Sequence, residues 1–310
     1  MKAGRDVFPC LLALAACSRT IDVGSSADAG SGTLRAALEA AAGDPRIRTI
    51  TVRRGLTPIT LAAPLAWRGP QPLAIDGRGI VLDASRLTDS TLAPGNAALV
   101  ASPEGDFVLR DLTVRGAGGS GIVVLVHASA SGELSVTLDR VVLEGNGHHG
   151  VLVNDQAGYF ANPFTEDSAG SAAGVRVAVR DSRFLRNGAG GLDYDGLRIN
   201  EGGPGALSVV VSGSRAEENG GDGIELDERG DGNAEVEIDD TATLGNGFFS
   251  TVDLDDGIDV DEYGPGDLRV RLGRVTASRN AQMGVDLTEN GPGERLVASD
   301  QVIAEGNPDD

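Results

Sequence analysis

Asparagine recurs through the second half of the chain at intervals that suit a coiled repeat. The six asparagines are Asn146, Asn187, Asn219, Asn246, Asn280 and Asn307. The shortest interval is 27 residues, from Asn219 to Asn246. Periods of about 20–50 residues are typical of solenoids, in which each repeat buries its apolar face only against its neighbours. Stacked rungs are therefore expected. They would place each asparagine above the last, where the side-chain amides can hydrogen-bond along a corner.

Apolar and polar residues alternate within each repeat. Val209 and Val211 precede one asparagine, and Val236 and Ile238 precede the next. Alternation by two indicates strands. A third strand in each repeat follows the asparagine and is introduced by glycine, at Gly150, Gly196, Gly223, Gly257 and Gly284. Three strands per rung are therefore predicted, which agrees with a content of 45 glycines and only 4% aromatic residues.

One helix is expected ahead of the repeats, over residues 33–42. Leu34, Ala37 and Leu38 share an apolar face, and Thr33 can cap the first turn. We expect this helix to cover the open end of the first rung, because an uncovered sheet end invites aggregation.

The residues from Gly32 to Asp83, which begin Gly-Thr-Leu-Arg-Ala-Ala-Leu, resemble the first part of many bacterial right-handed β-helices. The repeats resemble those of the pectate lyase and polygalacturonase superfamily. The resemblance implies an all-β fold, a right-handed parallel β-helix solenoid with three strands per rung and a short N-terminal capping helix. We expect this domain to span residues 33–310.

The first residues predict export and lipid anchoring. Residues 1–16 are expected to be a lipoprotein signal peptide, because Lys2 and Arg5 precede an apolar stretch that is too short to span a bilayer. The stretch ends in Leu14-Ala15-Ala16-Cys17, which resembles a lipobox. The resemblance implies cleavage before Cys17 and lipidation of its sulfur. An ordinary secretory signal with a chance cysteine is the alternative.

Lipidation of Cys17 would place the protein in the cell envelope as a lipid-anchored protein, and Ser18 favours the outer membrane or cell surface. Residues 17–32 are rich in Ser, Gly, Ala and Asp and are expected to form a flexible tether. The net charge of −20 argues against nucleic acid, whose phosphates attract Lys and Arg. The charge suits a cation-binding surface or a soluble, self-repelling one. We expect a monomer.

The strand after the asparagine corner has the most unusual outward residues. Asp195, Asp222 and Asp256 precede the glycine of this strand in three consecutive rungs. The outward positions that follow are Arg198 and Asn200, Glu225 and Asp227, and Asp259 and Asp261. Neighbouring strands lie about 4.7–4.9 Å apart, so stacked carboxylates repel unless a cation, a proton or an arginine intervenes. Arg198 is such a partner, and calcium, which prefers oxygen ligands, is another.

The predicted calcium ligands are Asp222, Asp227, Asp259 and Asp261. Insertions at residues 154–174, 189–194 and 248–255 are expected to wall a cleft over this strand, because long loops on a solenoid usually build its binding face. Substrate contacts are predicted for His149, Glu225, Asp259 and Tyr194. Phe248 and Phe249 are candidate sugar platforms.

Short motifs on this strand resemble those of two polysaccharide-degrading families. Asp255-Asp256-Gly257, Gly221-Asp222-Gly223 and Gly147-His148-His149-Gly150 are similar to polygalacturonase elements. The aspartates with Arg198 are similar to the calcium-binding Asp and basic Arg of pectate lyases. The resemblance implies catalytic roles for Asp195, Asp222, Asp256 and Arg198. The chain departs from both patterns, since the His motif comes first and no Arg-Ile-Lys motif follows.

Two functions stay open. The preferred hypothesis is an envelope-anchored β-helix that binds polysaccharide in an acidic cleft, with cleavage by a lyase- or glycosidase-like reaction as an open question. A hydrolase would use Asp222 with Asp195 or Asp256, and the separation of the carboxylates would decide between retention and inversion. The alternative is a non-catalytic structural or adhesion protein whose acidic ladder is a solvated face.

Overall fold

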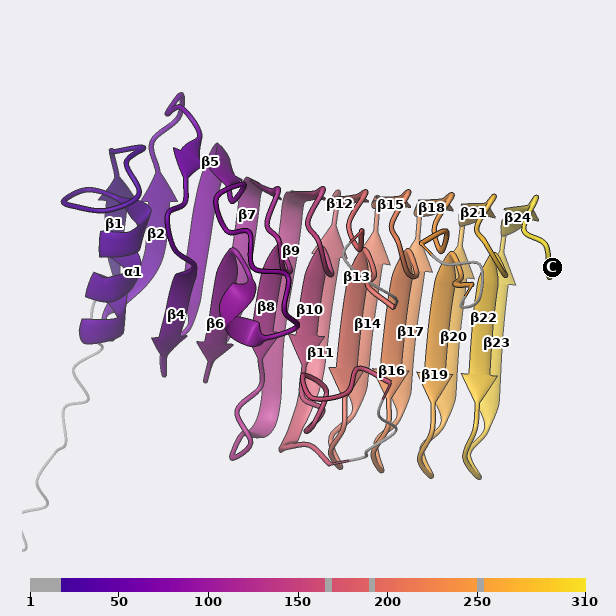
Figure 1. Ribbon diagram of the computed structural model, residues 1–310. Helices are drawn as coiled ribbons and strands as arrows, with labels where there is room; N and C mark the ends of the chain where they lie inside the picture. Colours follow the sequence, from indigo (N-terminus) through magenta and orange to yellow (C-terminus); the bar gives the residue numbers. More distant parts are fainter. Residues whose placement is uncertain (1–17, 165–168, 190–192, 250–253) are drawn as a thin grey trace, which may run out of the picture.

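The computed structural model describes residues 18–164, 169–189, 193–249 and 254–310. The predicted signal peptide (residues 1–16) and the lipidation site Cys17 lie outside the described residues. The described chain forms a parallel β-helix whose rungs follow one another along the sequence from α1 to the C-terminus (Figure 1). The predicted all-β solenoid is confirmed.

One face of the solenoid is an eight-stranded parallel sheet, in the order β22-β19-β16-β13-β10-β8-β6-β4. Its strands are β4 (Leu65–Gly69), β6 (Leu99–Pro103), β8 (Ile122–Leu125), β10 (Val151–Asn154), β13 (Leu197–Glu201), β16 (Ile224–Glu228), β19 (Ile258–Glu262) and β22 (Val285–Glu289). Of these, β10, β13, β16, β19 and β22 are the strands that were predicted after the asparagine corners.

The other two faces belong to a sixteen-stranded sheet. Its strands in the first rungs are β1 (Arg19–Val23), β2 (Ile47–Val52), β3 (Ile59–Thr60), β5 (Leu73–Asp83), β7 (Phe107–Arg115) and β9 (Ser131–Glu144). The later ones are β11 (Ala172–Arg180), β12 (Arg183–Leu185), β14 (Leu207–Ser212), β15 (Arg215–Glu217), β17 (Ala234–Asp239), β18 (Ala242–Leu244), β20 (Leu268–Gly273), β21 (Thr276–Ser278), β23 (Arg295–Asp300) and β24 (Ile303–Glu305). Each later rung therefore contains three strands, such as β13, β14 and β15. A short 3-10 turn, η1 (Pro94–Asn96), precedes β6.

The asparagine corner is a hydrogen-bonded ladder, as predicted. The amide Nδ2 of Asn146 donates to Oδ1 of Asn187 at 2.9 Å, and the same bond links each later pair up to Asn280 and Asn307. The backbone N–H of each asparagine also donates to the Oδ1 of the next. These side chains are therefore structural.

The left-handed backbone of this corner lies at the residue before each asparagine. Arg186, Glu218 and Arg279 have φ values of 54°, 55° and 57° there. In the other three rungs the same position is a glycine, at Gly145, Gly245 and Gly306. The corner therefore holds either a glycine or a charged residue in the left-handed conformation.

The N-terminal end of the solenoid is covered by α1 (Leu34–Gly43), which packs against β1, β2 and β4. Oγ1 of Thr33 accepts the N–H of Ala36 at 3.2 Å, and the predicted apolar face of the helix is buried. The tether expected over residues 17–32 is wrong for Arg19–Val23, because these residues form β1 and pair in parallel with β2.

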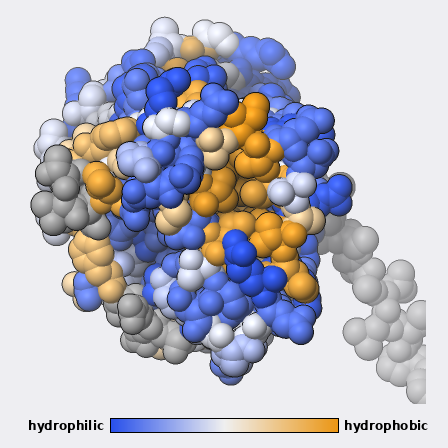
Figure 2. Space-filling view, turned by 90° about the vertical axis from the view of Figure 1, so that its right-hand side faces the viewer, coloured by the Kyte–Doolittle hydropathy of each residue, from blue (hydrophilic) through white to orange (hydrophobic). Residues whose placement is uncertain are grey.

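The C-terminal end is apolar and uncovered in the described chain (Figure 2). Leu296, Val297 and Ile303 of the last rung are 48%, 41% and 49% exposed. The last residue, Asp310, accepts the N–H of Gly284 at 2.8 Å and so closes only the corner beside the asparagine ladder.

Candidate functional site

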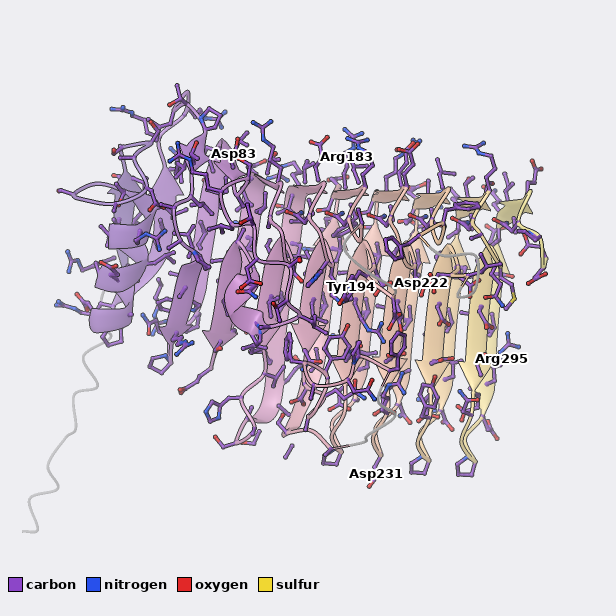
Figure 3. The ribbon with its side chains drawn as sticks, viewed as in Figure 1. Asp83, Arg183, Tyr194, Asp222, Asp231 and Arg295 are labelled. Atoms are coloured by element: carbon purple, nitrogen blue, oxygen red, sulfur yellow. The ribbon has the colours of Figure 1, made fainter. Side chains whose placement is uncertain are left out.

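The outward residues of the eight-stranded sheet form three vertical columns, as the repeat predicted. The first column is His149, Asp195, Asp222, Asp256 and Met283. The second is Leu152, Arg198, Glu225, Asp259 and Asp286, and the third is Asn154, Asn200, Asp227, Asp261 and Thr288. Tyr194 and Asp222 lie on this face (Figure 3). The sequence-predicted site residues are therefore brought together on one side of the molecule.

The first column is a second ladder, which uses carboxylates in place of amides. The N–H of Asp222 donates to Oδ1 of Asp195 at 2.8 Å, and the N–H of Met283 donates to Oδ1 of Asp256 at 2.5 Å. The N–H of Asp256 donates in the same way to Oδ1 of Asp222. One oxygen of each aspartate is thus engaged in holding the next rung. This leaves only the second oxygen of each for any chemistry.

Arg198 lies in the middle of the acidic residues and is only 2% exposed. Its Nη1 lies 2.9 Å from Oδ1 of Asp193 and 2.6 Å from Oε2 of Glu225, and its Nη2 lies 3.1 Å from Oδ2 of Asp227. The ring of Tyr159 covers the guanidinium, with 5.2 Å between its centroid and Cζ. The guanidinium therefore offsets several buried carboxylates at once, and it is sealed from solvent.

His149 is also buried and its ring atoms are engaged. Its Nδ1 accepts the N–H of Asp195 at 3.0 Å, and its Nε2 lies 2.7 Å from the hydroxyl of Tyr159. Burial lowers the pKa of His149. These contacts fit a neutral ring that carries its proton on Nε2 and donates it to Tyr159. A direct substrate contact, which was expected for His149, does not fit this position.

The insertion between β10 and β11 explains the burial. Tyr159 and Leu152 are fully buried and pack together with Val100 and Val123 in a small apolar cluster outside the solenoid wall. This insertion covers the part of the acidic face nearest the N-terminus. The open cleft expected over Asp195 and Asp222 is therefore wrong, because these two side chains are 0% and 5% exposed.

Burial sets the protonation of the acidic face. It raises the pKa of Asp193 to about 7 and that of Asp256 to about 6. Burial, with the neighbouring aspartates, raises the pKa of Asp222 and of Asp259 well above the usual range. For Asp195 burial acts in the same direction, but the contacts with His149 and Arg198 outweigh it and lower the pKa. The acidic face therefore has more carboxyl groups than its arginines can balance.

Two groups of carboxylates are close enough to share a cation. One consists of Asp193, Asp195, Asp222 and Glu225, and the other of Asp256, Asp259 and Asp286, with the ligand oxygens of each group within 4.8 Å of one another. Three members of the first group, Asp193, Asp195 and Glu225, contact Arg198. The second group lies beyond the covering insertion and is partly exposed at Asp259 and Asp286. Oδ1 of Asp259 is buried and forms no hydrogen bond with the described residues.

The predicted set of calcium ligands is divided by this arrangement. Asp222 belongs to the first group and Asp259 to the second. Oδ2 of Asp227 accepts hydrogen bonds from Arg198 at 3.1 Å and from Arg229 at 2.9 Å. Oδ2 of Asp261 accepts the hydroxyl of Tyr263 at 2.5 Å. The carboxylates that group with Asp259 in the structure are therefore Asp256 and Asp286, and not the predicted Asp227 and Asp261.

Sequence reasoning missed Asp193, which contacts Arg198 from the non-repeating insertion before β13. Its φ of 56° is a backbone conformation that favours small polar residues, and the acidic ending Asp193-Tyr194-Asp195 was the available signal. Tyr194, a predicted substrate contact, stacks on His148 with 4.2 Å between ring centroids and is partly exposed.

Similarity of this chain to known proteins is found at the level of the fold. No protein-family model and no curated protein matches the chain. Among the described residues, no helix has both the length and the apolar character to cross a bilayer. A solved structure described as "Geobacillus virus E2 - ORF18" is similar, with a TM-score of 0.52 and 13% identity. The match covers 90% of this chain and 61% of the viral chain, so this chain spans less than two thirds of that protein. The likeness shows a common fold.

Proposed function

We propose that the chain is an envelope-anchored β-helix that binds polysaccharide through a calcium ion held by Asp256, Asp259 and Asp286. The observation that carries the proposal is the convergence of these three carboxylates at the exposed edge of the acidic face. The nearest arginines on this face, Arg198 and Arg229, pair with other carboxylates such as Asp227. Among the described residues, neither forms an ion pair with Asp256, Asp259 or Asp286.

The chemistry of the three ligands favours a hard divalent cation. All are carboxylate oxygens, and calcium takes about six to eight oxygens in a flexible arrangement. Each of the three side chains offers one ligand oxygen in this group, so water or a ligand has to supply the rest. Sugar hydroxyl and carboxylate oxygens would complete the coordination, and the partial exposure of Asp259 and Asp286 leaves room for them.

Binding is favoured over cleavage. The carboxylates that were expected to act as acid and base, Asp195 and Asp222, are buried and hold neighbouring rungs. A glycosidic bond has to reach both groups for hydrolysis, and a sugar cannot do so beneath Tyr159 and its loop. A non-catalytic role at the cell surface therefore suits the geometry better than a lyase or hydrolase.

The proposal is tested by calorimetric titration of calcium, and then of glycans, into the purified protein. We expect calcium binding that Asp259→Asn weakens at least tenfold. Asp300→Asn, on the exposed strand β23 of the last rung, is the matched control. Uronic-acid and neutral glycans should bind only with calcium at this site. Unchanged calcium affinity in Asp259→Asn, or release of reducing ends during the titration, would contradict it.

A further inference from the structure

A groove of about 600 Å³ runs along the asparagine corner, on a different side of the rungs from the carboxylate groups. Its lining includes Arg186, Glu218, Phe248, Phe249 and Arg279. This volume lies in the range of about 300–1,000 Å³ that ligand pockets occupy. The asparagine ladder beneath it is a rigid base, since each amide there is bonded to the next.

Two phenyl rings project from this groove into solvent. Phe248 is 62% and Phe249 is 44% exposed. The N–H of Phe249 donates to the carbonyl of Gly220 at 3.1 Å, which fixes this part of the insertion to the rung below. Gly220 itself has no room for a side chain, because a Cβ there would come within 2.4 Å of the carbonyl oxygen of Gly188. Beside the two rings, the groove is therefore lined at Gly220 by backbone without a side chain.

The groove presents one exposed guanidinium without an ion-pair partner among the described residues, in a strongly acidic protein. The net charge of the chain is −20, yet the groove brings together two arginines and one glutamate. Arg186 contacts Glu144 and lies 4.0 Å from Glu218, whereas Arg279 forms no ion pair with the described residues. Distant charges are screened within about 8 Å at physiological salt, so the nearby guanidinium groups decide which ligand is attracted.

The spacing of the arginines favours an extended ligand. Arg186 and Arg279 precede Asn187 and Asn280, which lie three rungs apart in the ladder. At about 4.7–4.9 Å per rung this is roughly 14–15 Å. This is the separation of their backbone positions, so a ligand that pairs with both guanidinium groups without drawing them toward each other carries anionic groups at a comparable separation. A short polymer with repeated carboxylates meets this requirement, and a small anion does not.

We propose that this groove binds an acidic glycan, whose uronic-acid carboxylates pair with Arg279 and Arg186 while sugar rings pack on Phe248 and Phe249. Guanidinium and carboxylate groups form paired, charge-assisted hydrogen bonds. Pyranose rings present flat C–H faces that suit phenyl rings, which an acidic peptide backbone does not. The inference deepens the proposed function by naming the substrate class, and it needs no calcium.

The test measures the affinity of oligogalacturonate and of a neutral oligosaccharide of equal length in the presence of a chelator. We expect binding of the uronate alone. The double variant Phe248→Ala and Phe249→Ala should lose at least tenfold in affinity, and Arg279→Gln at least fivefold with a weaker salt dependence. Phe164→Ala, an equally exposed phenylalanine on another insertion, and Arg48→Gln, on the first rungs, are matched controls and should bind as the parent does.

Failure of this inference can be told from failure of the calcium site. Asp259→Asn should leave the chelator-resistant binding unchanged even if it abolishes the calcium-dependent part. Equal binding of the neutral glycan, or undiminished binding by the phenylalanine double variant with an unchanged melting temperature, would overturn the inference. So would a shift of that variant from self-associated to monomeric in sedimentation without any loss of glycan affinity.

Discussion

At the scale of single residues, one buried cation stabilises the acidic face. Arg198 lies within 3.5 Å of four carboxylates, those of Asp193, Asp195, Glu225 and Asp227. Buried charges that lose their partner are costly, since neither water nor another charge replaces it. The guanidinium is therefore a structural group in this protein, where family resemblance had implied a catalytic one.

Removal of this cation should destabilise the fold. We expect Arg198→Gln to lose about 3–5 kcal/mol of unfolding free energy at pH 7. The loss should be smaller at pH 5, because carboxyls such as Asp193, with a pKa of about 7, then hold protons and repel less. Urea denaturation at the two pH values measures this. Arg215→Gln, which breaks an exposed pair with Glu217, should cost less than about 1 kcal/mol. An equally small loss for Arg198→Gln would contradict the account.

At the scale of elements, the later strands of the eight-stranded sheet end in a fourth column, which consists of buried or partly buried glutamates. The column is Glu201, Glu228, Glu262 and Glu289, in register on β13, β16, β19 and β22. Each accepts the N–H of the glycine two residues later. Burial, together with the neighbouring glutamates, raises the pKa of Glu228 to about 8 and that of Glu262 to about 9. Oε2 of Glu228 and Oε2 of Glu262 lack other partners in the described chain, so protons shared between neighbouring carboxyls are needed to satisfy them.

This column makes stability depend on pH in a definite direction. The folded protein holds protons up to about pH 8 that the unfolded chain releases near its ordinary value of 4.5. Unfolding free energy should therefore fall as pH rises from about 4.5 to 8. Glu228→Gln removes one such titrating group. As the pH rises from 5 to 8, the unfolding free energy of the variant should therefore fall by about 2 kcal/mol less than that of the parent. Thermal unfolding at both pH values tests this, with exposed Glu305→Gln as the control that should show no such difference.

The asparagine ladder should couple the stability of neighbouring rungs. Asn219→Ala removes two donated bonds and two accepted ones in the interior of the ladder. We expect a loss of about 3–5 kcal/mol, because several buried backbone and amide groups are left without partners. Asn307→Ala removes as many hydrogen bonds, but it lies beside the uncovered end of the solenoid, where water can reach the groups left without partners, so it should cost clearly less. Similar losses at the two positions in denaturant titrations would argue against a cooperative ladder.

Periodicity explains which features of the fold and site could be predicted. The vertical alignment of Asp195, Asp222 and Asp256 follows from the repeat length, and so do the three strands per rung. The burial of Asp195 could not be predicted, because Tyr159 reaches it from an insertion that follows no period. Asp193 was missed for the same reason. The strand β1 was missed because the residues around it are Ser- and Gly-rich, and because its pairing with β2 and its packing against α1 are not visible in the sequence.

At the scale of the whole molecule, lipid anchoring of Cys17 remains a prediction from the lipobox resemblance. It predicts that the parent protein sediments with membranes and is released by detergent. Cys17→Ala should remain unprocessed or be recovered without lipid, which mass spectrometry of the N-terminal peptide can establish. A parent peptide that lacks diacylglycerol would contradict the anchoring.

The solenoid as a whole presents a closed N-terminal end, an apolar C-terminal end and a long acidic face between them. On that face, Asp259 and Asp286, near the C-terminal end, are partly exposed, whereas Asp195, Asp222 and Glu225 are buried. This difference in exposure is the basis for proposing cation binding at the group of Asp256, Asp259 and Asp286.

The most direct measurement is an anomalous difference map from crystals grown with calcium. The account predicts a peak at about 2.3–2.6 Å from carboxylate oxygens of Asp256, Asp259 and Asp286. Crystals of Asp259→Asn should lack this peak while the rungs stay in register. Well-ordered side chains at these three positions with no peak at millimolar calcium would contradict the central claim.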